Sequence, residues 1–111
     1  MEIQASQSES VLLIRVAGRM DSVTSPEFER RVSELTGPHT PRVALDLAEL
    51  EYISSMGLRS LLVFARQVKT AGGELRLDNV EGRIREVFHI SGFLQILPIH
   101  SSVEEAMAAF G

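Results

Sequence analysis

The chain lacks cysteine and tryptophan, and it has only one tyrosine and five phenylalanines among its 111 residues. The absence of cysteine excludes disulfides, thiol catalysis and cysteine-ligated metal sites. It also suits the reducing cytoplasm, which is the location we expect. With so few aromatic rings, a platform for stacking nucleic-acid bases is not expected. The hydrophobic fraction of 44% is enough for one apolar core without covalent staples.

Strong positive charge and long apolar segments are missing as well. Eleven basic and 15 acidic residues give a formal net charge of -4 and a pI of about 5.3, which argues against nucleic acid as a partner. The longest apolar runs, such as residues 61–65, are far too short to span a bilayer. The first ten residues have neither the basic nor the apolar region of a secretory signal. We therefore expect no membrane insertion.

The common catalytic motifs are also absent. The sequence contains no glycine-rich nucleotide loop, and its histidines, His39, His89 and His100, lack the spacing of metal ligands. We therefore predict no metal, no cofactor and no enzymatic activity. One alternative stays open, a small hydrolase in which Ser55 works with a distant histidine, although Ser55 lacks a G-x-S-x-G context. Labelling by a fluorophosphonate probe would be its test.

Hydrophobic periodicity predicts a single α/β domain over residues 1–111. The predicted strands are residues 2–6, 10–17, 43–47, 75–78 and 96–99. Apolar residues at helical spacing predict four helices. Their buried faces are formed by Phe28, Val32 and Leu35; by Leu58, Leu61, Leu62, Ala65 and Val68; by Val80, Ile84, Val87 and Phe88; and by Val103, Ala106, Met107 and Phe110. The resulting order, β-β-α-β-α-β-α-β-α, implies parallel pairings with crossover helices. The exposed edge of such a sheet would allow two copies to pair weakly.

Local signals place the boundaries of these elements. We predict a turn at residues 6–9, a loop from Gly18, and a connecting loop at residues 48–55. Ser25 is predicted to cap a helix whose first residue is Pro26. Ser102 is predicted to form a capping box with Glu105. Pro98 assigns the last strand to a sheet edge.

The most informative stretch joins the strand at residues 43–47 to the second helix. Ser54 and Ser55 lie at the predicted start of that helix, where unpaired amides and the positive end of the helix dipole meet. A phosphate at this point would find donors and a favourable field. Arg59 follows Ser55 by one helical turn and could approach such a phosphate. Local chemistry alone leaves open that both serines are only helix caps.

Several segments resemble the STAS-domain anti-sigma factor antagonists. Tyr52-Ile-Ser-Ser-Met-Gly-Leu-Arg-Ser-Leu-Leu resembles the signature of that family. Gly18-Arg-Met-Asp21 resembles the Gly-x-hydrophobic-Asp loop of the family, and the later segments Ala71-Gly-Gly-Glu-Leu and Val87-Phe-His-Ile-Ser-Gly-Phe follow in the family order. The resemblance implies a STAS-type α/β fold, a mixed and mostly parallel β-sheet with helices packed on one side.

The resemblance also implies a partner and a modification. In the family, an anti-sigma factor that is a GHKL-type serine kinase phosphorylates a serine, and a phosphatase restores it. Aligned on Gly57 and Leu58, that serine is Ser55. The unphosphorylated form would capture the anti-sigma factor and so regulate transcription. The predicted partner-binding residues are Asp21, Ser54, Ser55, Met56, Gly57 and Arg59.

Three positions depart from the family pattern. Ser54 stands where many members have Asp, Met56 where many have Ser or Thr, and Arg59 where Gly is common. These departures are consistent with a distinct partner or with loss of the switch, and Asp21 is equally interpretable as a turn residue. Small STAS proteins also resemble accessory subunits of lipid-transporting ABC systems. In that alternative the second helix would dock on an ATPase, and Ser55 would be structural.

Overall fold

The computed structural model describes residues 1–8, 10–37, 42–92 and 97–110, which contain six strands and four helices. In chain order these are β1 (Glu2–Ser8), β2 (Val11–Met20), α1 (Ser25–Thr36), β3 (Arg42–Asp46), β4 (Leu50–Ile53), α2 (Ser55–Thr70), β5 (Glu74–Asp78), α3 (Gly82–Ser91), β6 (Ile99–His100) and α4 (Val103–Ala109). The order matches the sequence prediction except for one additional strand, β4.

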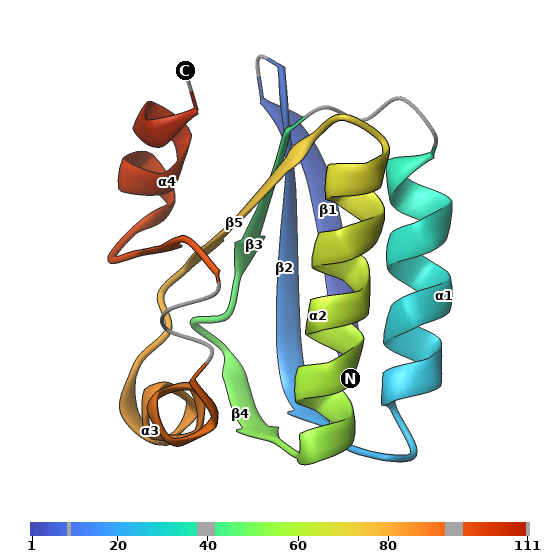
Figure 1. The fold of residues 1–111 in the computed structure, drawn as a ribbon, viewed down its shortest axis with the longest axis vertical. Coiled ribbons are helices and arrows are strands. Elements are labelled where there is room, and N and C mark those ends of the chain that lie inside the picture. The colour runs from blue at the N-terminus through green and yellow to red at the C-terminus, as the bar shows by residue number, and fades with distance from the viewer. Residues whose placement is uncertain (9, 38–41, 93–96, 111) are drawn as a thin grey trace.

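One mixed sheet organises the chain, with its strands in the order β1-β2-β3-β5-β6 (Figure 1). β1 and β2 are antiparallel, whereas β2–β3, β3–β5 and β5–β6 are parallel pairs. β4 runs parallel to the last residues of β2, where the register shifts between Gly18 and Arg19. Parallel neighbours need crossover connections, which the helices supply. The predicted mixed and mostly parallel sheet is confirmed.

Side chains alternate across this sheet, and the face covered by α1 and α2 holds the main core. Ile14, Leu45 and Leu77, from three neighbouring strands, are fully buried there. α1 and α2 lie side by side over them (Figure 1). Phe28 of α1 meets Phe64 of α2 edge to face, with ring centroids 6.0 Å apart, a favoured aromatic geometry. α3 adds its buried side chains to the same core.

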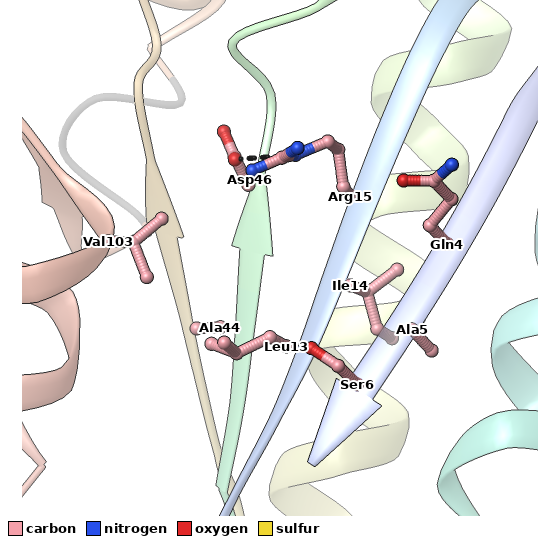
Figure 2. A pocket seen from close by; sticks show the side chains of 9 residues that line it. All are labelled: Gln4, Ala5, Ser6, Leu13, Ile14, Arg15, Ala44, Asp46 and Val103. Atoms are coloured by element: carbon pink, nitrogen blue, oxygen red, sulfur yellow. Dashed lines mark hydrogen bonds and ion pairs between the residues drawn. The ribbon is translucent and has the colours of Figure 1, made fainter. Parts of the chain in front are cut away.

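The opposite face of the sheet is only partly covered, by α4. Phe110, just after α4, forms a small second core there with Val11 and Ala44. The prediction that helices pack on one side therefore holds for α1, α2 and α3, and α4 is the exception, because its apolar stripe needs an apolar surface of its own. Beside α4 the face is hollowed into a pocket of about 410 Å³ that β1, β2 and β3 border (Figure 2).

The first strands and the predicted loops differ from the sequence analysis. β1 and β2 continue to Ser8 and to Met20, so the turn predicted at residues 6–9 and the loop predicted from Gly18 were wrong; residue 9 itself lies outside the described residues. The loop predicted for residues 48–55 contains β4. This strand is too short for a visible period, and it forms because its backbone pairs with the end of β2.

The predictions for the helix starts had two outcomes. Ser25 does not cap α1, because it is the first residue of that helix, it is buried, and its hydroxyl has no partner among the described residues. Thr24 occupies the N-cap position instead. Ser102 does cap α4, since its hydroxyl accepts from the amide of Glu105 over 3.1 Å. The Glu105 carboxylate bonds Ser101, so the predicted capping box forms only in part.

The last strand is shorter than predicted. β6 consists of Ile99 and His100 and pairs only with β5 among the described strands, at the end of the sheet. Pro98 directly precedes it, which agrees with the predicted edge position. Residue 96, where the predicted strand began, lies outside the described residues.

Candidate functional site

The start of α2 rests on a backbone contact with the end of β2. The amide of Ser54 donates to the carbonyl oxygen of Met20 over 2.8 Å. Ser54 is extended (φ −92°, ψ 176°) and occupies the N-cap position, where its hydroxyl accepts from the amide of Gly57 over 3.2 Å. One of the otherwise unpaired amides of the first turn is thereby satisfied. Ser54 is the cap of this helix.

Replacing Ser54 with alanine should lower the free energy of unfolding by about 1 kcal/mol, because the Gly57 amide loses its acceptor. Urea unfolding followed by circular dichroism would measure the loss. Ser55→Ala is the matched control, and we expect it to change stability by less than about 0.5 kcal/mol. Equal losses in the two variants would contradict the assignment of the cap to Ser54.

Ser55 is the first residue of α2, and its side chain is exposed. Its hydroxyl forms no hydrogen bond within the part of the chain that the structure describes. The free amides of the first helical turn and the helix dipole favour an anion at this end. Ser55 can therefore accept a phosphate without losing an intramolecular contact.

Gly57 lies where the first turn of α2 presses against β2 and β4. A Cβ at this position would stand 2.7 Å from the carbonyl oxygen of Met20 and 2.8 Å from Cγ1 of Ile53. Both distances are shorter than side-chain carbons tolerate. Gly57 is also buried, so it lies beneath the surface to which the sequence analysis assigned it. Its role is to let the helix start approach the strand.

We expect Gly57→Ala to destabilise the fold by about 1–3 kcal/mol, because the added methyl group overpacks the contact with Met20. This loss would appear although alanine favours a helix interior over glycine by about 1 kcal/mol. Gln67→Ala, at an exposed position of the same helix, serves as the control. A Gly57→Ala protein with an unchanged urea midpoint would show that the contact is not tight in solution.

Asp21 shapes the loop that precedes α1 and borders the start of α2. Its Oδ1 accepts from the amides of Val23 and Thr24, both over 3.0 Å. The hydrogen bond from the Thr24 amide is the main reason that the pKa of the Asp21 carboxyl is lowered. Its Oδ2 lies 3.7 Å from Nε of Arg19. Asp21 thus has the turn-forming role that the sequence left open.

Three exposed apolar side chains belong to the segments that meet here, the loop before α1, β4 and the first turn of α2. Val23, Tyr52 and Met56 are 82%, 41% and 43% exposed. The guanidinium carbon of Arg19 lies 4.2 Å from the ring centroid of Tyr52, within the range of a cation–π contact. Val23 and Tyr52 were not predicted, because an apolar residue in a polar loop and a half-exposed residue in a short strand carry no periodic signal. Exposed apolar groups that cluster mark interaction surfaces.

Arg59 is exposed and lies one helical turn beyond Ser55, on the same side of α2. It forms no ion pair within the described ranges. We call Val23, Tyr52, Ser55, Met56 and Arg59 together the Ser55 surface. The predicted site residues therefore divide into three exposed ones, Ser55, Met56 and Arg59, with Asp21 and Ser54 half-buried and Gly57 buried.

A second polar group lies on the sheet face that α4 covers in part. Asp46 and Asp78 are register neighbours on β3 and β5, and both are buried. Nε of Arg15 lies 3.1 Å from Oδ2 of Asp46 (Figure 2). Asn79, in the left-handed conformation at φ 56°, donates to both carboxyl groups, over 3.0 Å to Asp46 and 3.1 Å to Asp78. This group was not predicted from the sequence.

The two carboxyl groups of this pair differ in acidity. Burial, followed by the negative charge of Asp46, raises the pKa of Asp78 to about 7. Burial also acts to raise the pKa of Asp46, but hydrogen bonds from Asn79, a backbone amide and Arg15 outweigh it and lower that pKa. Near neutral pH Asp46 is therefore ionised, whereas Asp78 is protonated in part of the molecules and ionised in the rest.

The described residues contain no cluster of three or more side chains suited to hold a metal ion. No helix in the described ranges has the length and apolar character needed to cross a bilayer.

Comparison with known proteins identifies the class. The model of the STAS domain matches residues 2–106, and the chain belongs to the STAS family. BtrV of Bordetella bronchiseptica, to which an anti-sigma factor antagonist role is assigned, is 38% identical over 110 residues, which are 99% of this chain and 95% of BtrV. Among solved structures, an anti-sigma factor antagonist from Mycobacterium paratuberculosis has a TM-score of 0.87 at 22% identity, covering 97% of this chain and 92% of its own.

A second solved structure shows the same fold in a modified protein. The phosphorylated form of the Bacillus cell fate determinant SpoIIAA has a TM-score of 0.71 at 20% identity, covering 96% of this chain and 97% of its own.

Proposed function

We propose that this protein is a cytoplasmic anti-sigma factor antagonist that binds an anti-sigma factor with serine kinase activity through the Ser55 surface. Phosphorylation of Ser55 would switch that binding off. The observation that carries the proposal is the exposed, unbonded hydroxyl at the first position of α2, next to exposed Tyr52 and Met56. The assigned role of BtrV, 38% identical over nearly the whole chain, supports the same class.

The switch would act through charge rather than through unfolding. A phosphate on Ser55 adds about 1.5–2 negative charges near pH 7. At a helix start the dipole stabilises this charge, by about 0.3–1 kcal/mol, so the fold remains intact. A partner that covers Tyr52 and Met56 would exclude water from the phosphate beside them. Removing a dianion from water is costly, and the complex would dissociate.

The modification needs no catalytic residue in this chain, because Ser55 is the substrate of the partner. The Ser55 oxygen would attack the γ-phosphorus of ATP bound to the anti-sigma factor, ADP would leave, and the hydroxyl proton would pass to a base of the kinase. A phosphatase would then add water to the phosphoserine and release inorganic phosphate. Arg59, on the same side of α2 as Ser55, would pair with the phosphate until the phosphatase removes it.

Phosphorylation in vitro tests this proposal. The protein would be mixed with ATP and a candidate GHKL-type anti-sigma factor that binds it, and the modified residue mapped by mass spectrometry. We expect one phosphate on Ser55, none on Ser55→Ala, and an unchanged site in the control Ser54→Ala. Phosphate on another residue, or none with a partner proven to bind, would overturn the proposal. Co-purification of a transporter ATPase in place of an anti-sigma factor would also overturn it.

A further inference from the structure

We propose that two copies of this chain pair through β1, antiparallel and centred on Ala5, to form one continuous sheet. The proposal concerns the sheet edge opposite β6 and is independent of the role of Ser55.

The two ends of the sheet differ in how they are protected. β6 has two residues and follows Pro98, and both features blunt an edge. β1 has seven residues that pair with β2 in an unbroken register, Glu2 with Ala17 through Ser8 with Val11. Among the described strands, β1 pairs only with β2. Its other side therefore presents unpaired backbone groups along its whole length.

The sequence of β1 lacks the features that usually prevent edge pairing. It has no lysine, arginine or proline, its pairing with β2 has no bulge, and its one charged residue is Glu2 at the beginning. Ala5, Ser6 and Gln7 are exposed and uncharged. The whole chain carries a net charge of -4, to which β1 contributes only Glu2, so two copies meet at this strand with little repulsion.

A two-fold axis at Ala5 pairs all seven residues of the strand. In this register Ala5 faces Ala5 of the second copy, Gln4 faces Ser6, and Glu2 faces Ser8. No like charges oppose each other, and directly opposed like charges are what destabilises strand pairs. Even-numbered residues meet even-numbered ones, so corresponding faces of the two sheets lie on the same side. Any other centre leaves part of β1 unpaired.

The pairing would also change the open face of the sheet. Gln4 and Ser6 form the β1 border of the pocket that Leu13, Arg15 and Asp46 line further in (Figure 2). In the dimer, Gln4 and Ser6 of the second copy continue this border. The two pockets then lie on one face across the axis, and the second copy contributes polar side chains to the surroundings of each.

Sedimentation equilibrium over a concentration series would test the association. We expect a reversible dimer for the natural chain. Ala5→Lys places two ammonium groups across the axis and should raise the dissociation constant at least tenfold. Ala71→Lys, at an alanine that is also exposed and lies just after α2, is the matched control and should leave the dissociation constant unchanged. A natural chain that stays monomeric up to about 1 mM would overturn the proposal.

The register can be tested separately because the chain is free of cysteine. Opposed residues of an antiparallel pair have Cα atoms roughly 4.5–5.5 Å apart, within reach of a disulfide. With oxidised glutathione as the oxidant, which is reduced to two glutathione molecules, Ala5→Cys should form a covalent dimer. Gln4→Cys and Ser6→Cys should do so when mixed but much less when alone, because diagonal pairs are roughly 7–8 Å apart.

Other patterns would contradict the inference. A dimer that Ala5→Lys leaves intact, or cross-linking of Gln4→Cys alone as efficient as the mixture, would assign the contact to another surface or register. A monomer whose β1 amide resonances shift only when the anti-sigma factor is added would assign the edge to that partner, and self-pairing would be wrong.

Discussion

Ser55→Asp should weaken binding to the anti-sigma factor by about 30-fold or more in Kd. A carboxylate on the Ser55 surface must lose water when the partner covers Tyr52 and Met56, and an uncompensated buried charge costs about 2–5 kcal/mol at an interface. Isothermal titration calorimetry at a fixed salt concentration would measure the change. Ser55→Ala removes only an unbonded hydroxyl, so we expect it to bind as the natural chain does.

Two controls separate this effect from general charge and from misfolding. Gln67→Glu adds the same charge at an exposed position further along α2 and should leave the Kd unchanged within twofold. The unfolding midpoint of Ser55→Asp should be equal to or above that of the natural chain, since an acidic residue suits a helix start. If Ser55→Asp binds as tightly as Ser55→Ala, the Ser55 surface is not where the partner docks.

The second large effect is the pH dependence of stability that the carboxyl pair Asp46 and Asp78 produces on the sheet face partly covered by α4. The pKa of Asp78 is about 7 in the folded chain, against an ordinary value of 3.8. Between these values the folded chain holds a proton that the unfolded chain has released, so Asp78 makes stability fall as pH rises. The fall is at most about 1.4 kcal/mol per pH unit and ends above pH 7. On the order of 4 kcal/mol is its upper bound.

Asp46 acts in the other direction and in another pH range. Its lowered pKa adds stability above the ordinary value of 3.8, and this stability is lost as pH falls through the folded-state pKa. Arg15 and Glu104 also act on Asp78, Arg15 by lowering its pKa and Glu104 by raising it. The contribution of the Asp46–Asp78 pair to stability is therefore expected to be largest near about pH 4–5.

Asp78→Asn isolates the effect. The amide of asparagine resembles the protonated carboxyl in shape and carries no titratable proton, so the decline between pH 4 and pH 7 should largely disappear. At pH 7.5 and above the variant should be more stable than the natural chain. Urea unfolding at half-unit pH intervals would measure both curves, with Glu104→Gln as the control that keeps most of the slope. Parallel curves for the natural chain and Asp78→Asn would contradict the assignment to Asp78.

A feature could be predicted from the sequence when the residues that form it are close together in the chain. The start of α2 was predictable because Ser54, Ser55 and the apolar helix that follows are neighbours in the chain. Asp46 and Asp78 are adjacent only because β3 pairs with β5, and hydrophobic periodicity does not contain that strand order. Tyr52 was missed for a related reason, since β4 exists only through its pairing with the end of β2.

The capping predictions show the same limit at short range. Ser102 and Ser25 both precede acidic helix starts, yet only Ser102 caps its helix. Asp21 forms the turn before α1, so that helix begins one residue earlier than predicted and Ser25 is drawn into it, beneath the surface. The turn formed by Asp21, four residues before Ser25, thus determines where the helix begins, which the local capping motif does not.

The contact between Gly57 and the carbonyl oxygen of Met20 also affects how a partner would detect phosphorylation of Ser55. The close approach of Gly57 and the hydrogen bond from the Ser54 amide to the same carbonyl hold the first turn of α2 against the end of β2. Crystals of the phosphorylated and unphosphorylated chains should therefore trace the same backbone path. The partner would have to distinguish the two forms by electrostatics alone, and raised ionic strength should narrow the difference between them.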